Sequence, residues 1–208
     1  MQQGDIRFVK MLVLVNGLTP LALLVWDQSR HRLGANPQNF LILTTGMMTL
    51  IFLMLTMAVT PVRKVFGLNW LIQLRRMFGL FAFFYGCLHF LCFYSLDRAF
   101  SLSSTLHEIV ARQYLWFGIT ALLAMVPLAI TSTNGMIKRL GGKRWRALHR
   151  LAYVAAIAGA VHFFMQVKAD VRLPLAFAAL LAVLLGYRLL DWWRRSKRAP
   201  ATAAAVKS

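Results

Sequence analysis

Six apolar segments of similar length constrain the fold of this chain more than any other feature. They cover about residues 8–26, 40–59, 76–95, 114–131, 148–166 and 173–192. Each approaches the ~20 residues that an α-helix needs to cross the hydrocarbon layer of a bilayer, where a helix satisfies its own backbone hydrogen bonds. We therefore expect an all-α membrane protein, a six-helix transmembrane bundle in which residues 1–193 form one domain.

The composition fits a chain that lies almost wholly in a membrane. Of its 208 residues, 59% are hydrophobic and only 14% are charged, with a mean hydropathy of +0.61. A soluble domain has ~45–50% apolar and ~25% charged residues. The first apolar segment lacks a small-residue cleavage site, so we interpret it as a retained span and not as a removed signal peptide. Residues 194–208 are basic and then rich in alanine, and we expect them to form a disordered cytoplasmic tail.

The basic residues that give the net charge of +18 are concentrated in alternate loops. Eighteen of the 24 Lys and Arg residues lie in the N-terminus, in residues 60–76 and 132–150, and in the tail from Arg188, while the other three loops hold six. The positive-inside rule then places both termini and the 132–150 loop in the cytoplasm. Because this alternation accounts for the basic charge, we expect no nucleic-acid partner. Six tryptophans near the span ends fit the aromatic belts of a membrane protein.

Three histidines lie in the apolar segments or at their ends, while His31 and His107 lie in loops and are expected to be solvated. An ionisable residue inside a span is costly and is therefore a functional candidate. His89 precedes the outer end of the third segment by six residues, and His162 precedes that of the fifth by four. Both segments run in the same direction, so the two imidazoles share one depth. That is the geometry for bis-histidine ligation of one haem iron.

Small residues precede both histidines on nearly the same helical face. They are Gly86, Ala82 and Gly79 before His89, and Gly159, Ala158 and Ala155 before His162. A porphyrin needs flat space beside its ligand, although small residues also simply let helices approach each other. The two cysteines, Cys87 and Cys92, match neither a disulfide framework nor a metal motif, and we expect them to be core residues.

His149 lies at the inner start of the fifth segment, thirteen residues before His162. On an ideal helix the two are ~20 Å apart along the axis and ~140° apart around it. Either the first turn is therefore distorted, or the helix buries a wide face. A second haem at the depth of His149 would need another ligand from the third segment. The residue at that position, fourteen before His89, is Arg75, which is not a usual iron ligand.

Three arginines flank His149 in the sequence RWRALHRLAY. Arg144, Arg146 and Arg150 are candidates to hold haem propionates or a phosphate through bidentate contacts. A positive-inside cluster explains the same residues equally well.

These features resemble the ferric reductase-like transmembrane domain superfamily. The resemblance rests on six spans, a histidine on the third, two histidines thirteen apart on the fifth, and a W-x-x-x-H-R-x-x-Y motif at Trp145, His149, Arg150 and Tyr153. Within that superfamily the chain is similar to the haem-binding membrane subunits of bacterial protein-methionine-sulfoxide reductase systems. This closer likeness covers essentially the whole chain, including the T-S-T-N segment at 131–134 and the pair Arg75 and Arg76.

The resemblance implies one or two haem b groups, with His89 and His162 as the outer pair and His149 as an inner ligand. Oxidase and ferric reductase relatives carry a second histidine where this chain has Arg75. FMN binding is attributed to the family. The resemblance further implies a bacterial inner-membrane protein that takes electrons from quinol or a cytosolic flavin reductase. It would pass them to a periplasmic molybdopterin methionine sulfoxide reductase.

The oxidase and ferric reductase relatives also carry a C-terminal domain that binds flavin and nicotinamide. We expect that this chain differs from them in this respect and does not oxidise NAD(P)H by itself. We expect an electron-transfer subunit with no substrate chemistry of its own. Two other functions remain open. One is a quinol-oxidising cytochrome b subunit for another periplasmic reductase, and the other is a non-redox small transporter or assembly factor whose histidines bind a proton or a metal.

Overall fold

The computed structural model describes the backbone of residues 3–205 and the side chains of residues 3–197, and all regular structure in that range is helical. Six of the described helices are long and apolar enough to cross a membrane. They are built on α1 (Gln3–Ser29), α2 (Pro37–Phe66), α3 (Ile72–Cys92), α5 (Gln113–Ile130), α8 (Leu151–Gln166) and α9 (Arg172–Ala205). The predicted six-helix fold is confirmed, and the protein is a multi-pass membrane protein.

Shorter helical elements connect the spans. They are the 3₁₀ turn η1 (Asn69–Leu71), the π-helical turn η2 (Phe93–Asp97), α4 (Leu102–Ala111), α6 (Asn134–Leu140) and α7 (Gly142–Leu148). Ser101 and Thr133 begin α4 and α6, because their side chains accept hydrogen bonds from backbone N–H groups three residues further on. Gly141 separates α6 from α7 at φ +74°, a conformation that favours glycine.

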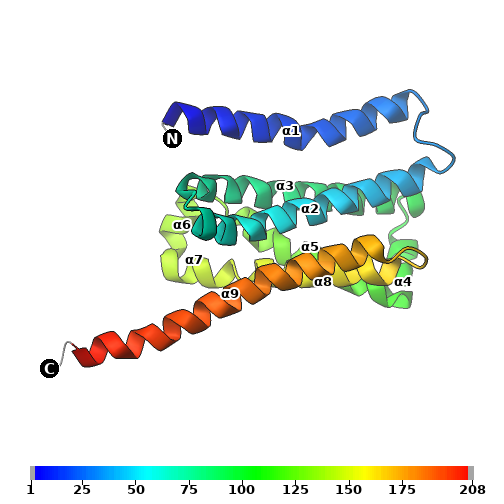
Figure 1. The fold of residues 1–208 in the computed structure, drawn as a ribbon. Coiled ribbons are helices and arrows are strands. Elements are labelled where there is room, and N and C mark those ends of the chain that lie inside the picture. Colours follow the sequence, from blue (N-terminus) through cyan, green and yellow to red (C-terminus); the bar gives the residue numbers. More distant parts are fainter. Residues whose placement is uncertain (1–2, 206–208) are drawn as a thin grey trace.

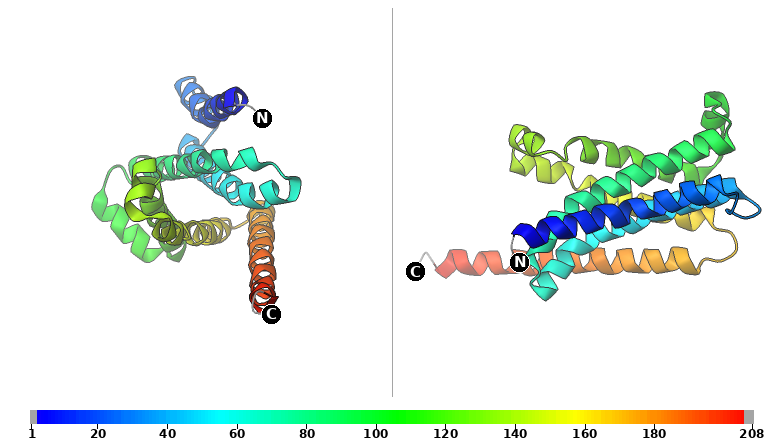
Figure 2. Two further views of the ribbon diagram at one scale, coloured as in Figure 1. Left: turned by 90° about the vertical axis from the view of Figure 1, so that its left-hand side faces the viewer. Right: turned by 90° about the horizontal axis from the view of Figure 1, so that it is seen from above.

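The central bundle consists of α2, α3, α5 and α8, while α9 lies along its outside (Figures 1 and 2). Within it α2 lies closest to α3, and α5 lies closest to α8. The side chains of Leu53, Met57 and Tyr85 fill the centre and are almost fully buried. Ala155 and Ala156 of α8 are fully buried as well, so this helix approaches its neighbours closely.

The first span, α1, is attached to the bundle through α3. The Tyr85 hydroxyl donates a hydrogen bond of 2.7 Å to the carbonyl of Gly17. The Phe81 ring lies so close to Gly17 that a Cβ there would meet it at 2.5 Å. In Figure 1 α1 lies above the other helices, at the outside of the bundle. Gly17 is therefore a point of close approach between α1 and the core.

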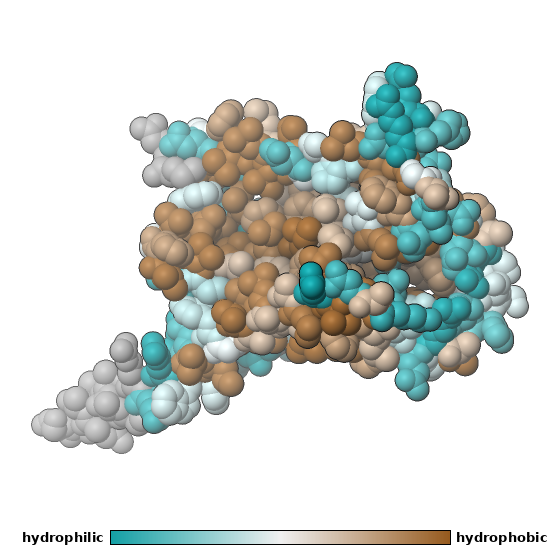
Figure 3. Space-filling view, turned by 45° about the vertical axis from the view of Figure 1, so that its right-hand side comes forward, coloured by the Kyte–Doolittle hydropathy of each residue, from teal (hydrophilic) through white to brown (hydrophobic). Residues whose placement is uncertain are grey.

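The two ends of the bundle differ. The start of α1 and the last turns of α9 lie at the end that carries α6 and α7, which we call the α6/α7 end (Figure 1). The opposite end, the α4 end, carries α4 and the α1–α2 connection. Figure 3 shows apolar side chains across the middle of one face, with hydrophilic residues gathered towards the right-hand side. An apolar band between polar ends is the surface that a bilayer requires.

The start of the fifth span departs from the sequence-based expectation. The fifth span was predicted as one helix over 148–166, but the structure interrupts it at His149 and Arg150. There the hydrogen bonds run from Arg150 N to Ala147 O (3.1 Å) and from Tyr153 N to Arg150 O (2.9 Å), three residues apart instead of four. The helix is therefore distorted at its start, which was one of the two alternatives. At the C-terminus the backbone of α9 continues to Ala205, and the expected disorder of residues 194–208 stays a prediction.

Candidate functional site

A cavity of about 340 Å³ lies between α2, α3, α5 and α8 towards the α4 end. Its volume falls within the ~300–1,000 Å³ of typical small-molecule sites. Apolar side chains such as Leu50, Phe90 and Met125 form most of its wall, and His89 and His162 both line it. The structure thus brings together the two histidines that the sequence places at one depth.

The distance between the two imidazoles suits a shared metal. Their ring centroids are 6.0 Å apart, and the ring planes cross at 80°. Two imidazoles on opposite sides of one ion, with metal–nitrogen bonds of ~2.0–2.1 Å, would have centroids about 6 Å apart. His89 and His162 therefore have the separation of axial ligands to one metal.

Backbone carbonyls of neighbouring helices fix both imidazoles. His89 Nδ1 lies 2.8 Å from the carbonyl oxygen of Ile42 on α2, and His162 Nδ1 lies 2.8 Å from that of Tyr114 on α5. A carbonyl oxygen only accepts, so each Nδ1 carries the proton and each Nε2 has a free lone pair. Within residues 3–205 neither Nε2 atom makes a hydrogen bond. This tautomer is the one that metal-binding histidines need.

A cluster of four charged residues lines the cavity near the α4 end. Arg98 forms ion pairs with Glu108 (3.2 Å) and Asp97 (2.5 Å), and Arg112 pairs with Glu108. The hydrogen bond from Arg112 to Tyr114 and the Glu108 carboxylate raise the pKa of the Arg112 guanidinium, so this group stays charged. These residues were not predicted from the sequence, because residues 96–113 have the pattern of a loop, whereas η2 and α4 fold them over the cavity.

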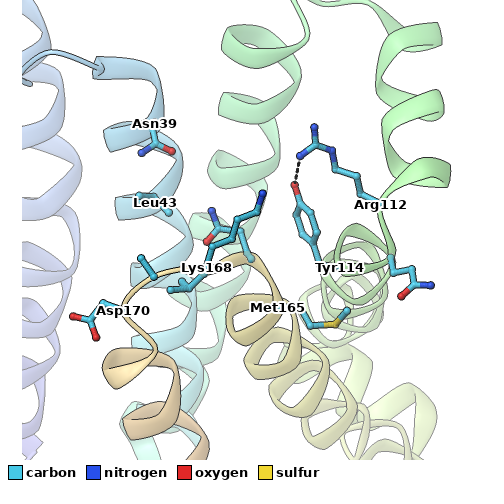
Figure 4. Close-up of a pocket in the computed structure, with 11 residues that line it drawn as sticks. Asn39, Leu43, Arg112, Tyr114, Met165, Lys168 and Asp170 are labelled. Atoms are coloured by element: carbon cyan, nitrogen blue, oxygen red, sulfur yellow. Dashed lines mark hydrogen bonds between the residues drawn. The ribbon is translucent and has the colours of Figure 1, made fainter.

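A second cavity of about 770 Å³ opens at the α4 end (Figure 4). Tyr114 points towards Arg112 across it, while Asp170 points away. Its lining residues include Asn39, Arg112, Tyr114 and Gln166, which also line the histidine cavity. The histidine pair therefore lies next to an opening at this end of the molecule.

The small residues before the histidines divide into two groups. Gly86, Gly159 and Ala155 line the cavity, as a flat ligand beside the histidines would require. Ala82 and Ala158 are buried but are not among the residues that line it. Gly79 also lies away from it, with its nearest neighbour at Thr56.

His149 has different partners from the other two histidines. Its Nε2 lies 3.1 Å from the Thr131 hydroxyl, and its ring stacks on Trp145 with centroids 3.9 Å apart. The Trp145 indole donates to the Thr131 carbonyl at 3.0 Å. Trp145, a member of both the interfacial belt and the W-x-x-x-H-R-x-x-Y motif, thus packs on His149. Arg75 lies within electrostatic range of His149.

Contacts between helices join the other motif residues. Arg76 donates to Asn134 Oδ1 at 2.9 Å, which ties the start of α3 to the 131–134 segment. Tyr153 accepts a hydrogen bond of 2.9 Å from Arg188 of α9, and Arg188 also donates to the Met57 carbonyl. The structure thus gives these sequence motifs a role in holding the α6/α7 end together.

The remaining candidates lie away from the histidine cavity. Arg144 and Arg150 are exposed at the α6/α7 end and do not line that cavity. Arg75 is half-buried and lies within electrostatic range of Arg63 and Arg188. Cys87 is exposed on α3, in contrast to its expected place in the core, because it lies on the outward face of that helix; Cys92 is half-buried.

Fold and site together define a class, namely a multi-pass helical membrane protein with two histidines facing one cavity between its central spans. The family described as "Ferric reductase like transmembrane component" matches residues 42–160. The chain belongs to this family and, within it, to the MsrQ proteins.

Several relatives carry the name protein-methionine-sulfoxide reductase heme-binding subunit MsrQ. The protein of Herminiimonas arsenicoxydans is 45% identical over 93% of this chain and 90% of its own length. That of Rhodospirillum rubrum is 47% identical over 93% and 94%, respectively. That of Ralstonia nicotianae is 42% identical over 97% and 94%. The likeness therefore extends over nearly the whole of both chains.

Proposed function

We propose that this protein is the haem-binding subunit of a protein-methionine-sulfoxide reductase and holds a haem b between His89 and His162. One observation carries the proposal. Both imidazoles line one cavity at the spacing of axial ligands, and their Nδ1 atoms are bound to backbone carbonyls, which leaves each Nε2 for iron. The printed names of the relatives, heme-binding subunits, agree with this chemistry.

The chain supplies binding, orientation and exclusion of water. Haem iron, when bound, accepts and returns a single electron. The carbonyls of Ile42 and Tyr114 orient the ligands and increase their basicity. The wall of the cavity is mostly apolar, and Arg98 and Arg112 on its rim would pair with the two propionates of a haem.

The proposed path of electrons runs from the α6/α7 end to the α4 end. The excess of basic residues makes the α6/α7 end cytoplasmic by the positive-inside rule. Electrons would enter there from quinol or from a cytosolic flavin reductase, with FMN as the flavin. They would leave at the opening beside Tyr114, towards a periplasmic molybdopterin methionine sulfoxide reductase. The membrane is then the bacterial inner membrane.

His149 is the proposed ligand of a second, inner haem. Its Nε2 is engaged with Thr131, so it offers iron its Nδ1, or its Nε2 once the Thr131 bond is given up. Arg75 and the exposed Arg144 and Arg150 supply positive charge near this end for propionates or a phosphate. The inner haem is thus proposed on fewer contacts than the outer one.

Haem content and spectra of single variants test the proposal. In purified protein we expect His89→Ala and His162→Ala each to abolish the same low-spin haem signal, because each removes one of two axial ligands of one iron. We expect His149→Ala to lose only part of the haem and to keep that signal. Retention of the signal in either of the first two variants would refute the pairing, and full haem retention in His149→Ala would refute the inner haem.

A further inference from the structure

His89 and His162 have equivalent surroundings. His89 bonds to the carbonyl of Ile42, and four residues further along α2 Gly46 lies against the same imidazole. His162 bonds to the carbonyl of Tyr114, and four residues further along α5 Gly118 lies against its imidazole. Each arrangement thus joins a carbonyl and a glycine of one helix to a histidine of its closest neighbour.

The two arrangements are also equivalent in the sequence. Gly46 and Gly118 are 72 residues apart, and His89 and His162 are 73 residues apart. A glycine stands three residues before each histidine, Gly86 and Gly159. The pair α2–α3 and the pair α5–α8 therefore form a parallel repeat, with one ligand in each copy.

Gly46 and Gly118 leave no room for a side chain. A Cβ at Gly46 would lie 2.9 Å from both Cε1 and Nδ1 of His89, and a Cβ at Gly118 would lie 2.9 Å from the same two atoms of His162. Non-bonded carbon atoms are separated by ~3.5–4.0 Å at their optimum. An imidazole is rigid, so a methyl group would displace the whole ring. One contacted atom is Nδ1, and the displacement would therefore strain its bond to the carbonyl.

We propose that Gly46 and Gly118 are positioning residues, whose missing side chains let His89 and His162 lie flat on the neighbouring helix within reach of the Ile42 and Tyr114 carbonyls. This inference rests on the proposed haem function. The two glycines hold the ring planes in their crossed orientation and keep Nδ1–H bonded. They thereby set the direction and the basicity of both iron ligands.

The experiment compares Gly46→Ala and Gly118→Ala with Gly79→Ala and Gly186→Ala in purified, haem-loaded protein. The first two are expected to bind haem about tenfold more weakly, as with other losses of a ligand's hydrogen-bond partner. Their ferric low-spin electron paramagnetic resonance signal should change its g-values, because the angle between the ring planes changes. Their midpoint potential should rise, since a less basic ligand stabilises the ferric state less.

The control variants separate ring displacement from the general effect of alanine in a helix. A Cβ at Gly79 meets Thr56 at an ordinary 3.9 Å, one at Gly186 has no neighbour within 4 Å, and neither glycine lines the histidine cavity. Both controls should keep the g-values and the potential of the unchanged protein. Alanine is the better helix former, so folding should be preserved in all four variants.

Two results would overturn the inference. One is that Gly46→Ala and Gly118→Ala keep the unchanged g-values and potential. The other is that they fail to accumulate as folded protein, because the inference requires an intact fold with a displaced ring. If the unchanged protein lacks a signal that depends on His89 and His162, the proposed function itself is wrong.

Discussion

At the scale of single residues, the arrangement of His89 and His162 depends on neighbouring groups that are not themselves candidate metal ligands. The carbonyls of Ile42 and Tyr114 select the tautomer in which Nε2 is free. Arg98 and Arg112 bring two positive charges to the rim of an apolar cavity, where they are already paired with Glu108 and Asp97. A ligand with two carboxylates would compete for these same guanidinium groups.

The rim arginines give a prediction at this scale. Arg98→Gln should weaken haem retention about tenfold, because a hydrogen bond to a charged group contributes ~1.5–3 kcal/mol and ~1.4 kcal/mol corresponds to a factor of ten. Transfer of haem to an excess of apomyoglobin measures this directly. Arg144→Gln, at the exposed far end, is the matched control and should not change the rate for the outer haem. Equal transfer from both variants would exclude Arg98 from propionate binding.

At the scale of helices, two packing modes coexist in the bundle. The central helices α2, α3, α5 and α8 enclose the cavity, whereas α1 lies against α3, with a close contact at Gly17 and a hydrogen bond from Lys10 to Gln73. There the Phe81 ring covers Gly17, and the Tyr85 hydroxyl donates to its carbonyl. The close packing of α1 on α3 at this point therefore depends on the absence of a side chain at Gly17.

This attachment predicts a stability effect. Gly17→Ala should destabilise the protein by about 1–3 kcal/mol, the usual range for overpacking, since its Cβ would meet the Phe81 ring at 2.5 Å. Thermal unfolding of the detergent-solubilised protein should show a lower midpoint. Gly4→Ala, on the same helix with no neighbour within 4 Å of its Cβ, should leave the midpoint unchanged. A midpoint unaltered by Gly17→Ala would mean that α1 is free to shift.

At the scale of the whole molecule, the distribution of charge supports the proposed orientation. The start of α1, the α6–α7 segment and the last turns of α9 lie at one end (Figure 1). That end carries most of the Lys and Arg residues, and the opening next to the histidine cavity lies at the other. The proposed electron path therefore ends at the α4 end, outside the cytoplasm.

Labelling of single cysteines in intact cells tests this orientation. In a background with Cys87→Ser and Cys92→Ser, Ser103→Cys on α4 should react with a thiol reagent that does not cross the inner membrane. Lys143→Cys on α7 should react only after that membrane is permeabilised. Both positions are exposed, so access depends on the side of the membrane. The opposite pattern would reverse the proposed direction of electron flow.

Features that depend only on the position of a residue along one helix could be predicted from the sequence. The apolar length of each segment determines that six helices span the membrane. The distances of His89 and His162 from their span ends place them at one depth, and Gly86 and Gly159 lie on the same faces. The sequence also left two alternatives for His149, and the irregular turn at Arg150 decided between them.

Contacts between residues of different helices were revealed only by the tertiary structure. Ile42 and Tyr114 carry no sequence signal, because any residue has a carbonyl group. Gly46 and Gly118 matter only because a histidine from another helix lies on them. Periodicity along one helix indicates which of its residues share a face. Which residues of a neighbouring helix contact that face depends on how the two helices pack and on their relative shift along the helix axis.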